Sequence, residues 1–189
     1  LGQLISVLSW KGGQGMLDAS LANYVDRLVV YGTAETIESV KRVAPLGLEL
    51  DTYGPGTAVG AIGRRELCRK DLPGLAWKAA VDISLYDQRG CLSLQTIFVE
   101  QGGEVAPEEF VSALAVAMEG VAFRYPPGRQ SVNEAACIRQ RRQLWNMKIL
   151  AGERVFQLGA PSGTWTVFYE PVLKMDEPVS GRMITVRTY

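Results

Sequence analysis

The first third of the chain alternates apolar runs with an amphipathic one. The run Arg27–Tyr31 is rich in β-branched residues and is closed by Gly32, which predicts a buried strand. Residues 34–44 then place apolar side chains at helical spacing behind a candidate N-cap, Thr33. Another extended segment is expected to begin at 48–50. A strand, a helix and a strand in this order indicate an α/β layer with a parallel sheet.

The rest of the chain continues this alternation. A long helix with one apolar stripe is expected to begin after Asp71, a candidate N-cap, and to stop near 88–90. An apolar run of strand length follows at 96–100. Further helices are expected over 107–119 and 131–145, and short strands over 154–158, 164–169 and 182–187. The division between two units is expected near 52–56, where one strand-helix-strand unit gives way to the next.

Charge and hydropathy argue against two classes of partner. The 189 residues carry 20 Lys and Arg against 20 Asp and Glu, so no field of one sign is available to gather nucleic acid or anionic lipid. No apolar run is long enough to cross a bilayer, although 47% of the residues are hydrophobic. The first ten residues lack the basic start and the cleavage site of a signal peptide. We therefore expect a soluble protein that binds neither nucleic acid nor membrane.

The absence of histidine narrows the chemistry further. No Ser-His-Asp triad, Cys-His dyad or His-ligated zinc can be built from this chain alone, and no metal site is expected. The three cysteines are an odd number at wide spacing, which fits free thiols in a reducing cytoplasm. Chemistry would then depend on Cys, carboxylates, Lys, Tyr, backbone dipoles or a cofactor.

Cys91 is the first candidate for chemistry. It follows a predicted helix in the loop DQRGCLS, where Gly90 permits close approach of the backbone. Amide N–H groups in such a loop can stabilise an oxyanion on a carbonyl that the sulfur attacks. The alternative is a small, buried apolar side chain, as most free cysteines are. Cys68, in a charged turn, and Cys137, on the apolar side of a helix, are expected to be packing residues.

Three other patterns are weaker candidates for binding. The glycine-rich KGGQG at 11–15 lacks the spacing of a P-loop or of GxGxxG and is interpreted as a turn. Gly32 and Thr33 join a strand to a helix N-terminus, which favours an anion, although a simple helix cap is the alternative. The basic residues of 64–70 and the run RQRRQ at 139–143 are expected to form a solvated surface.

Residues 71–100 resemble the stretch of aldehyde dehydrogenases in which a helix beginning Asp-Leu leads into a Gly/Gln-rich loop, the catalytic cysteine and a strand ending Phe-Val-Glu. The wording DQRGCLS around Cys91 is most similar to the acyl-CoA reductases related to the fatty-acid reductase of bacterial luminescence, whose loop reads Asp-Gln-x-Gly-Cys-Leu-Ser. VVYGTAET resembles the superfamily's turn that approaches the nicotinamide cofactor, and this carries onto Gly32 and Thr33. Further segments with a resemblance are DTYGPGTAVGAI, APEEFVSAL, WTVFYEPVL and RMITV.

This resemblance implies a three-layer α/β fold with a mostly parallel sheet flanked by helices. Residues 1–52 would be the C-terminal part of a nucleotide-binding domain, and residues 53–189 the catalytic cysteine domain. The implied activity is an acyl-CoA reductase: the acyl group passes from CoA to the Cys91 thiolate, and NADPH or NADH reduces the thioester to an aldehyde. An oxidising aldehyde dehydrogenase and a non-catalytic α/β interaction domain are the alternatives.

The sequence departs from the superfamily's pattern near the expected division. Oxidising members place a glutamate base just before the glycine that corresponds to Gly54, and Thr52 stands there instead. Glu49 and Asp51 are nearby but out of register. The loss fits a reductase, because an acyl-enzyme that is reduced by hydride needs no activated water. Related reductases often carry His-Arg after that glycine, where this chain has Pro55-Gly56.

The chain is also short for this superfamily, whose members are more than twice its length. We therefore expect it to be a domain fragment that is inactive alone. Any homo-oligomer would form through the parent protein.

Overall fold

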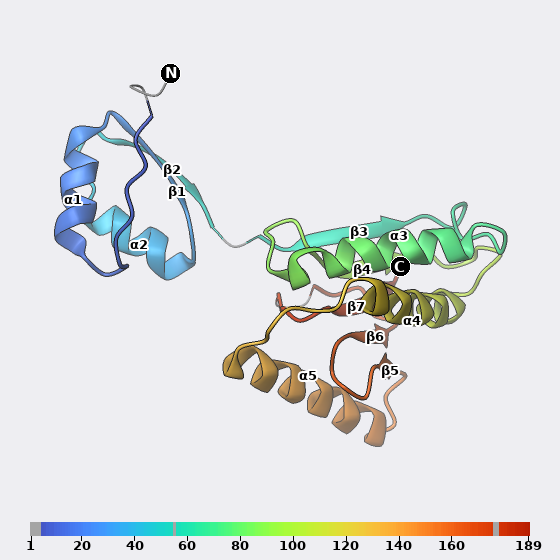
Figure 1. Ribbon diagram of the computed structural model, residues 1–189. Coiled ribbons are helices and arrows are strands. Elements are labelled where there is room, and N and C mark those ends of the chain that lie inside the picture. The colour runs from blue at the N-terminus through green and yellow to red at the C-terminus, as the bar shows by residue number, and fades with distance from the viewer. Residues whose placement is uncertain (1–4, 55, 176–177) are drawn as a thin grey trace. The chain divides into compact units, whose positions relative to one another are not determined.

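The computed structural model describes residues 5–54, 56–175 and 178–189. The chain divides into two compact units, with the division after residue 55 (Figure 1). The boundary implied by the resemblance, between residues 52 and 53, lies three residues earlier and falls inside a strand that ends at Tyr53.

The first unit contains two strands and two helices. These are α1 (Gly15–Tyr24), β1 (Arg27–Tyr31), α2 (Ala34–Val43) and β2 (Glu49–Tyr53). β1 and β2 pair in parallel, with Val29 opposite Asp51, so the predicted strand-helix-strand order is confirmed. Thr33 caps α2, because its Oγ1 accepts a hydrogen bond from the N–H of Thr36 at 3.2 Å.

The second unit is built on a five-stranded sheet. Its elements are β3 (Ala58–Ile62), α3 (Leu72–Ser84), the short turn η1 (Leu85–Gln88), β4 (Leu94–Val99), α4 (Pro107–Arg124), α5 (Val132–Leu150), β5 (Phe156–Gly159), β6 (Thr166–Glu170) and β7 (Met183–Thr188). The strand order is β3-β4-β7-β6-β5, and only the pairing of β5 with β6 is antiparallel. The expected mostly parallel sheet is confirmed.

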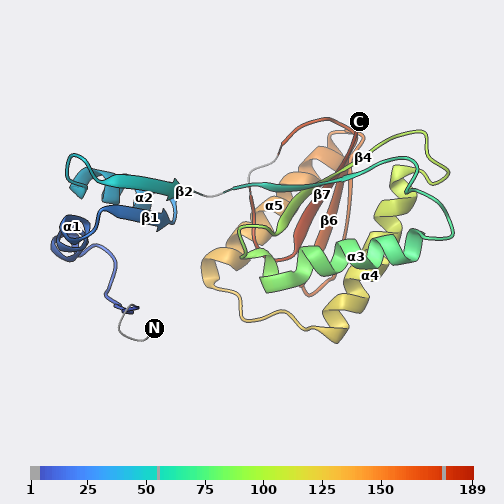
Figure 2. The same cartoon turned by 90° about the horizontal axis from the view of Figure 1, so that it is seen from above.

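The side-chain alternation of the strands explains the layers. Along β6, Val167 and Tyr169 join the large core that α3 and α4 cover, whereas Phe168 lies on the other face. There Phe168 stacks on Trp145 of α5, with ring centroids 4.8 Å apart. Figures 1 and 2 show α3 and α4 on one side of the sheet and α5 on the other. The second unit is therefore a three-layer α/β structure, as predicted.

Several expectations about the helices are wrong. α3 ends at Ser84 and not near 88–90, and α5 continues past residue 145 to Leu150. α4 does not end at Glu119 but continues through Gly120 to Arg124. A Cβ at Gly120 would lie 3.0 Å from Cζ3 of Trp77, so this glycine allows α3 and α4 to approach and does not end a helix. The run at 139–143 is not wholly a solvated face, because Arg142 is half-buried and donates to Thr166, Ala160 and Trp165.

None of the helices within the described ranges is long and apolar enough to cross a membrane.

Candidate active site

Cys91 lies in the turn that joins η1 to β4, and its side chain is exposed. The alternative of a buried packing cysteine is therefore wrong. The thiol borders a hollow of about 450 Å³ whose wall is mainly apolar. The other residues that line it are Asp82, Leu85, Tyr86, Gly90, Leu92, Ser93 and Leu94. The position gives the sulfur both solvent access and an apolar surface beside it.

The turn around Cys91 presents free backbone donors. The N–H of Ser93 donates to the carbonyl of Gly90 at 3.0 Å, which closes the turn. A Cβ at Gly90 would lie 3.1 Å from Oγ of Ser93, so glycine suits this tight turn. Within the described part of the chain, no acceptor takes the N–H of Cys91 or of Leu92. Such unpaired amides are the donors that an oxyanion beside the sulfur requires.

The backbone before Cys91 has an unusual conformation. Tyr86, Asp87 and Gln88 have φ angles of 53°, 51° and 60°, which place three consecutive non-glycine residues in the left-handed region. Each such residue costs roughly 1–2 kcal/mol relative to a right-handed conformation. α3 therefore ends at Ser84 in a sharp reversal, and tertiary contacts must compensate for this cost.

Those contacts come mainly from the start of β7, with others from the loop between α4 and α5 and from the start of β4. The Asp87 carboxylate accepts from Nε of Arg182 at 2.7 Å and from the N–H of Gly128 at 2.9 Å. The Gln88 amide is buried, accepts from the N–H of Met183 at 2.6 Å and donates to its carbonyl at 2.6 Å. Gln88 Nε2 also donates to the carbonyl of Leu94 at 2.7 Å, so it ties together both ends of the Cys91 turn.

Arg89 ties the same loop to the start of α5. Its Nε donates to the Glu134 carboxylate at 2.8 Å, and one terminal nitrogen donates to the carbonyl of Arg129 at 2.9 Å. Glu134 also accepts from the N–H of Ser131, which forms a reciprocal cap of α5. The hydrogen bond from Arg89, followed by those from Ser131, lowers the pKa of Glu134 to about 2.

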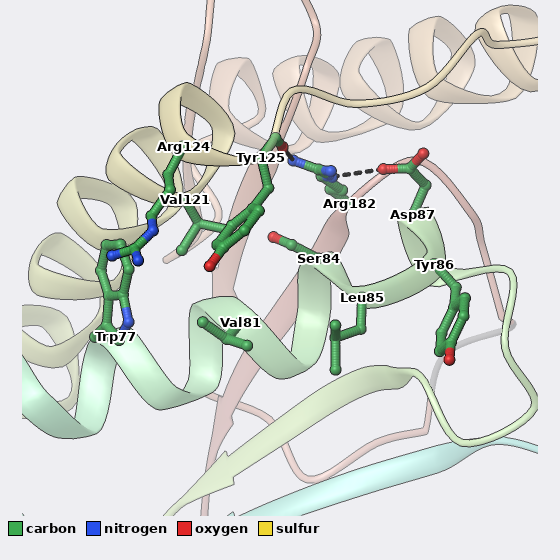
Figure 3. A pocket seen from close by; sticks show the side chains of 10 residues that line it. All are labelled: Trp77, Val81, Ser84, Leu85, Tyr86, Asp87, Val121, Arg124, Tyr125 and Arg182. Atoms are coloured by element: carbon green, nitrogen blue, oxygen red, sulfur yellow. Dashed lines mark hydrogen bonds and ion pairs between the residues drawn. The ribbon is translucent and has the colours of Figure 1, made fainter.

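A second hollow of about 590 Å³ lies between the C-terminal ends of α3 and α4 (Figure 3). Leu85 and Tyr86 line both this hollow and the one beside Cys91. The remaining wall is Trp77, Val81, Ser84, Asp87, Val121, Arg124, Tyr125 and Arg182. Figure 3 shows the Arg182 guanidinium between Asp87 and the carbonyl of Tyr125. Two mostly apolar hollows thus adjoin one pair of side chains close to the thiol.

Gly32 and Thr33 lie in the first unit, whereas Cys91 lies in the second. A Cβ at Gly32 would lie 2.9 Å from Cβ of Thr36, so only glycine fits at the end of β1. Because Thr33 caps the N–H of Thr36, the N–H groups of Ala34 and Glu35 are the ones left without an acceptor within the described residues. This helix start has the polarity that suits an anion.

The acidic residues near the missing glutamate are engaged with an arginine. Nε of Arg27 donates to Asp51 at 2.7 Å, and Glu49 forms an ion pair with the same nitrogen at 4.0 Å. Thr52 also lies in β2, and it is closer than Glu49 and Asp51 to the division between the two units. Pro55 of the pair Pro55-Gly56 lies outside the described residues. In the described part of this region, both carboxylates are paired with the same arginine.

The other two cysteines do not behave as predicted. Cys137 is exposed on α5, so its assignment to packing is wrong: at position 137 the helix surface turns away from the sheet. Cys68 is partly exposed, and its thiol donates to Asp71 at 3.1 Å, which raises the pKa of the thiol. Asp71 accordingly stands before α3 but makes no capping hydrogen bond with its side chain.

Sequence reasoning missed Asp87, Gln88 and Arg182. Asp87 and Gln88 belong to the loop DQRGCLS, yet nothing in their types indicates a left-handed backbone. The one available signal is Gly181, two residues before a buried strand that begins at Met183, which indicates a turn with a special backbone at that point. Among the described residues, no group of three or more potential ligands is suited to a metal ion.

Solved structures define the class of this fold. The NAD-dependent benzaldehyde dehydrogenase of Corynebacterium glutamicum is 15% identical, with a TM-score of 0.63 over 86% of this chain and 36% of its own. The aldehyde dehydrogenase KauB of Pseudomonas aeruginosa is 15% identical, with a TM-score of 0.64 over 90% and 37%. An NAD-dependent aldehyde dehydrogenase of Burkholderia multivorans is 18% identical, with a TM-score of 0.63 over 94% and 35%. The chain thus has an aldehyde dehydrogenase-like fold.

Within that class, the chain belongs to the acyl-CoA reductase (LuxC) family, whose model matches residues 1–189. The resemblance based on the sequence motif around Cys91 is therefore confirmed at the level of the family. No curated protein matches the chain. The chain spans only 35–37% of the three dehydrogenases above.

Proposed function

We propose that this chain supplies the catalytic cysteine domain of an acyl-CoA reductase, with Cys91 as the acyl acceptor. The Cys91 thiolate attacks the thioester carbonyl, the C–S bond to coenzyme A breaks, and coenzyme A leaves as its thiol after taking a proton. Hydride delivery to the enzyme thioester then releases the aldehyde and returns the Cys91 thiolate. The supporting observation is an exposed thiol at an apolar hollow, in a turn with two unpaired amide N–H groups.

The backbone of the turn contributes electrostatic stabilisation in both steps. Each step passes through a tetrahedral oxyanion on the former carbonyl carbon. The N–H groups of Cys91 and Leu92 are the donors that can bind this oxyanion. They are fixed by the closed turn and need no rearrangement when charge develops.

The two hollows suit the acyl chain. A chain attached to Cys91 meets Leu85, Leu92 and Leu94 first, and can continue past Leu85 toward Trp77 and Val81. Burial of each methylene there would contribute about 0.8 kcal/mol, so the length of the chain affects binding. The substrate class that these walls favour is a fatty acyl thioester.

A nicotinamide cofactor, NADPH or NADH, would supply the hydride. Gly32, Thr33 and the start of α2 are the residues proposed to hold it. The unpaired N–H groups of Ala34 and Glu35 offer donors for one of its phosphate oxygens, and Gly32 keeps the backbone accessible.

The engaged carboxylates favour reduction over oxidation. An oxidising aldehyde dehydrogenase must activate a water molecule to hydrolyse the enzyme thioester. Here Thr52 replaces the expected glutamate, and Arg27 pairs with both Asp51 and Glu49. The free thiols also fit a reducing compartment, so we place the protein in the cytoplasm.

Intact-protein mass spectrometry tests the acyl transfer. The purified chain is mixed with octanoyl-CoA and no cofactor, so that the reaction stops at the enzyme thioester. We expect one octanoyl adduct, located on Cys91 and absent from the Cys91→Ser variant. Cys137→Ser is the matched control, because Cys137 is an exposed thiol outside both hollows. No adduct, or equal labelling of Cys137, would rule out Cys91 as the acceptor.

The parent protein tests the complete reaction. With octanoyl-CoA and NADPH we expect octanal to form, whereas the present chain should show no turnover. Supplying octanal and NAD⁺ to the parent tests the oxidising alternative. If the second assay forms octanoic acid faster than the first assay forms octanal, the oxidising activity is favoured.

A further inference from the structure

The turn η1, which directs the chain from α3 to Cys91, has a conformation that its own residues disfavour. Tyr86, Asp87 and Gln88 are all left-handed, and none is glycine. L-residues at the end of a helix ordinarily prefer to continue right-handed. Tyr86 is 81% exposed, so burial of its own ring does not hold the turn. The contacts of Asp87 and Gln88 must therefore do so.

Those contacts converge on a second left-handed turn. Gly181 and Arg182 have φ angles of 91° and 56°. A Cβ at Gly181 would lie 2.5 Å from Cδ1 of Ile138, so a side chain here would have to displace Ile138 as well as adopt the left-handed backbone. The N–H of Gly181 donates to the Asp87 carbonyl at 3.2 Å, while Nε of Arg182 donates to the Asp87 carboxylate. The two unfavourable turns thus support each other.

Arg182 is the buried cation of this arrangement. It is only 4% exposed, and its Nη1 donates to the Tyr125 carbonyl at 2.9 Å (Figure 3). A buried guanidinium is stable only when it is paired and hydrogen-bonded, and Asp87 supplies the opposite charge. Gln88 completes the arrangement, since its amide bonds Met183 and closes the Cys91 loop at Leu94.

We propose that Asp87, Gln88 and Arg182 form a clamp that holds η1 left-handed and thereby fixes the direction in which the Cys91 thiol faces. All three are positioning residues that act through the loop. Without the clamp, η1 relaxes toward a right-handed continuation of α3, and Cys91 loses its alignment with the free amides of the turn. The catalytic part of this inference rests on the function proposed above, whereas the conformational part does not.

Hydrogen exchange tests the conformational part. We expect Arg182→Met to speed exchange of the amides of residues 85–93 by about tenfold or more, because the loop opens locally. Arg124→Met is the matched control: it removes the same charge from the same hollow, but Arg124 only stacks on the Tyr125 ring at 5.5 Å. The control should leave exchange of this loop within about twofold of the rate in the unmutated chain. Unchanged exchange in Arg182→Met would overturn the clamp.

A rescue variant separates the clamp from a general loss of stability. Glycine adopts a left-handed backbone without steric cost, so Tyr86→Gly in the Arg182→Met background should restore slow exchange of the loop. A merely structural role for Arg182 predicts no rescue, and that result would contradict the proposal. Should Arg182→Met not fold, Asp87→Asn takes its place, since it removes the charge of the pair while keeping the shape of the side chain. Asp87→Asn with parent-like exchange would likewise overturn the clamp.

Two probes of Cys91 test the catalytic consequence. In a Cys68→Ser, Cys137→Ser background, Arg182→Met should slow octanoyl transfer from octanoyl-CoA by about tenfold or more, because that reaction requires alignment. Alkylation by iodoacetamide at about pH 10, where ordinary cysteine thiols are ionised and the reaction requires only an accessible thiolate, should stay within about threefold. Equal slowing of both reactions would contradict a positioning role. If the chain with only Cys68→Ser and Cys137→Ser accepts no octanoyl group at all, the proposed function fails. The exchange experiment alone still decides whether the clamp exists.

Discussion

Arg89 links the loop of Cys91 to α5 through a carboxylate whose protonation can be controlled. In the folded chain the pKa of Glu134 is lowered to about 2, chiefly by the hydrogen bond from Arg89. In the unfolded chain this carboxyl returns to its ordinary range, so the folded state favours the ionised form. The resulting stabilisation is present above that ordinary range and is lost as the pH falls toward the folded pKa.

The variant Glu134→Gln isolates this effect. Glutamine can still accept from Ser131 and keep the cap of α5, but it does not ionise. We expect its melting temperature to fall less than that of the parent when the pH is lowered from about 6 to about 2.5. Thermal melts of both proteins at the two pH values measure the difference. Parallel curves for parent and variant would show that the Arg89 pair contributes no linkage.

At the scale of residues, the sequence predicts the turn that contains Cys91 but not what holds that turn in place. A cysteine between a helix and an apolar strand, beside a glycine, indicates a turn from local rules alone. The clamp joins Asp87 to Arg182, 95 residues later in the chain, and uses a left-handed backbone at residues that ordinarily avoid it. Contacts this distant carry no local signal. The exposure of Cys137 was missed because a small apolar side chain fits either side of a helix.

Arg142 on α5 shows how a single residue can attach a helix to a sheet. Its guanidinium donates to Oγ1 of Thr166 at 2.7 Å and to the carbonyl of Trp165 at 2.7 Å, and burial lowers its pKa. Arg139, on the same helix, is exposed. The run RQRRQ therefore contains arginines with different roles, and the charge pattern alone does not distinguish them.

We expect Arg142→Met to lower the free energy of unfolding by about 1–3 kcal/mol, because it removes three hydrogen bonds between α5 and the segment from Ala160 to Thr166. Arg139→Met is the matched control and should change it by less than about 0.5 kcal/mol. Urea denaturation of the parent and both variants measures the two values. A loss of the same size in both variants would show that Arg142 contributes only surface charge.

Element boundaries follow the local sequence where the termination signals are unambiguous. The Thr33 cap and the start of β1 agree with the sequence pattern, because both depend on neighbouring residues. α4 passes through Gly120 because the glycine serves contact with Trp77, which is a tertiary requirement. A glycine that ends a helix and one that admits a neighbouring ring look alike in sequence.

At the scale of the whole molecule, the class of the fold is more predictable than its topology. Alternating strands and helices predict the parallel α/β layers, since each signal is local. The insertion of β7 between β4 and β6, and the antiparallel pairing of β5, depend on which strands meet after long connections. The sequence pattern contains the strands themselves but no information on their order.

The two units differ in the size of their hydrophobic cores. The large hydrophobic core runs from Ile62 to Val186 and lies wholly in the second unit, as does the cluster of α5 with Phe168. The first unit holds a two-stranded sheet, and its buried hydrophobic residues within the described ranges are Ala22, Val30 and Ile37. A two-stranded sheet with so small a core is marginal in water.

We therefore expect a chain of residues 56–189 to fold alone, with a single cooperative melt within about 5 °C of the main transition of the full chain. A chain of residues 1–55 should show no cooperative transition, because it buries too little apolar surface to offset the loss of chain entropy. Circular dichroism melts of the two pieces and of the full chain make the comparison. A cooperative melt of residues 1–55, or a gradual one of residues 56–189, would show that the apolar cores do not determine which unit is stable.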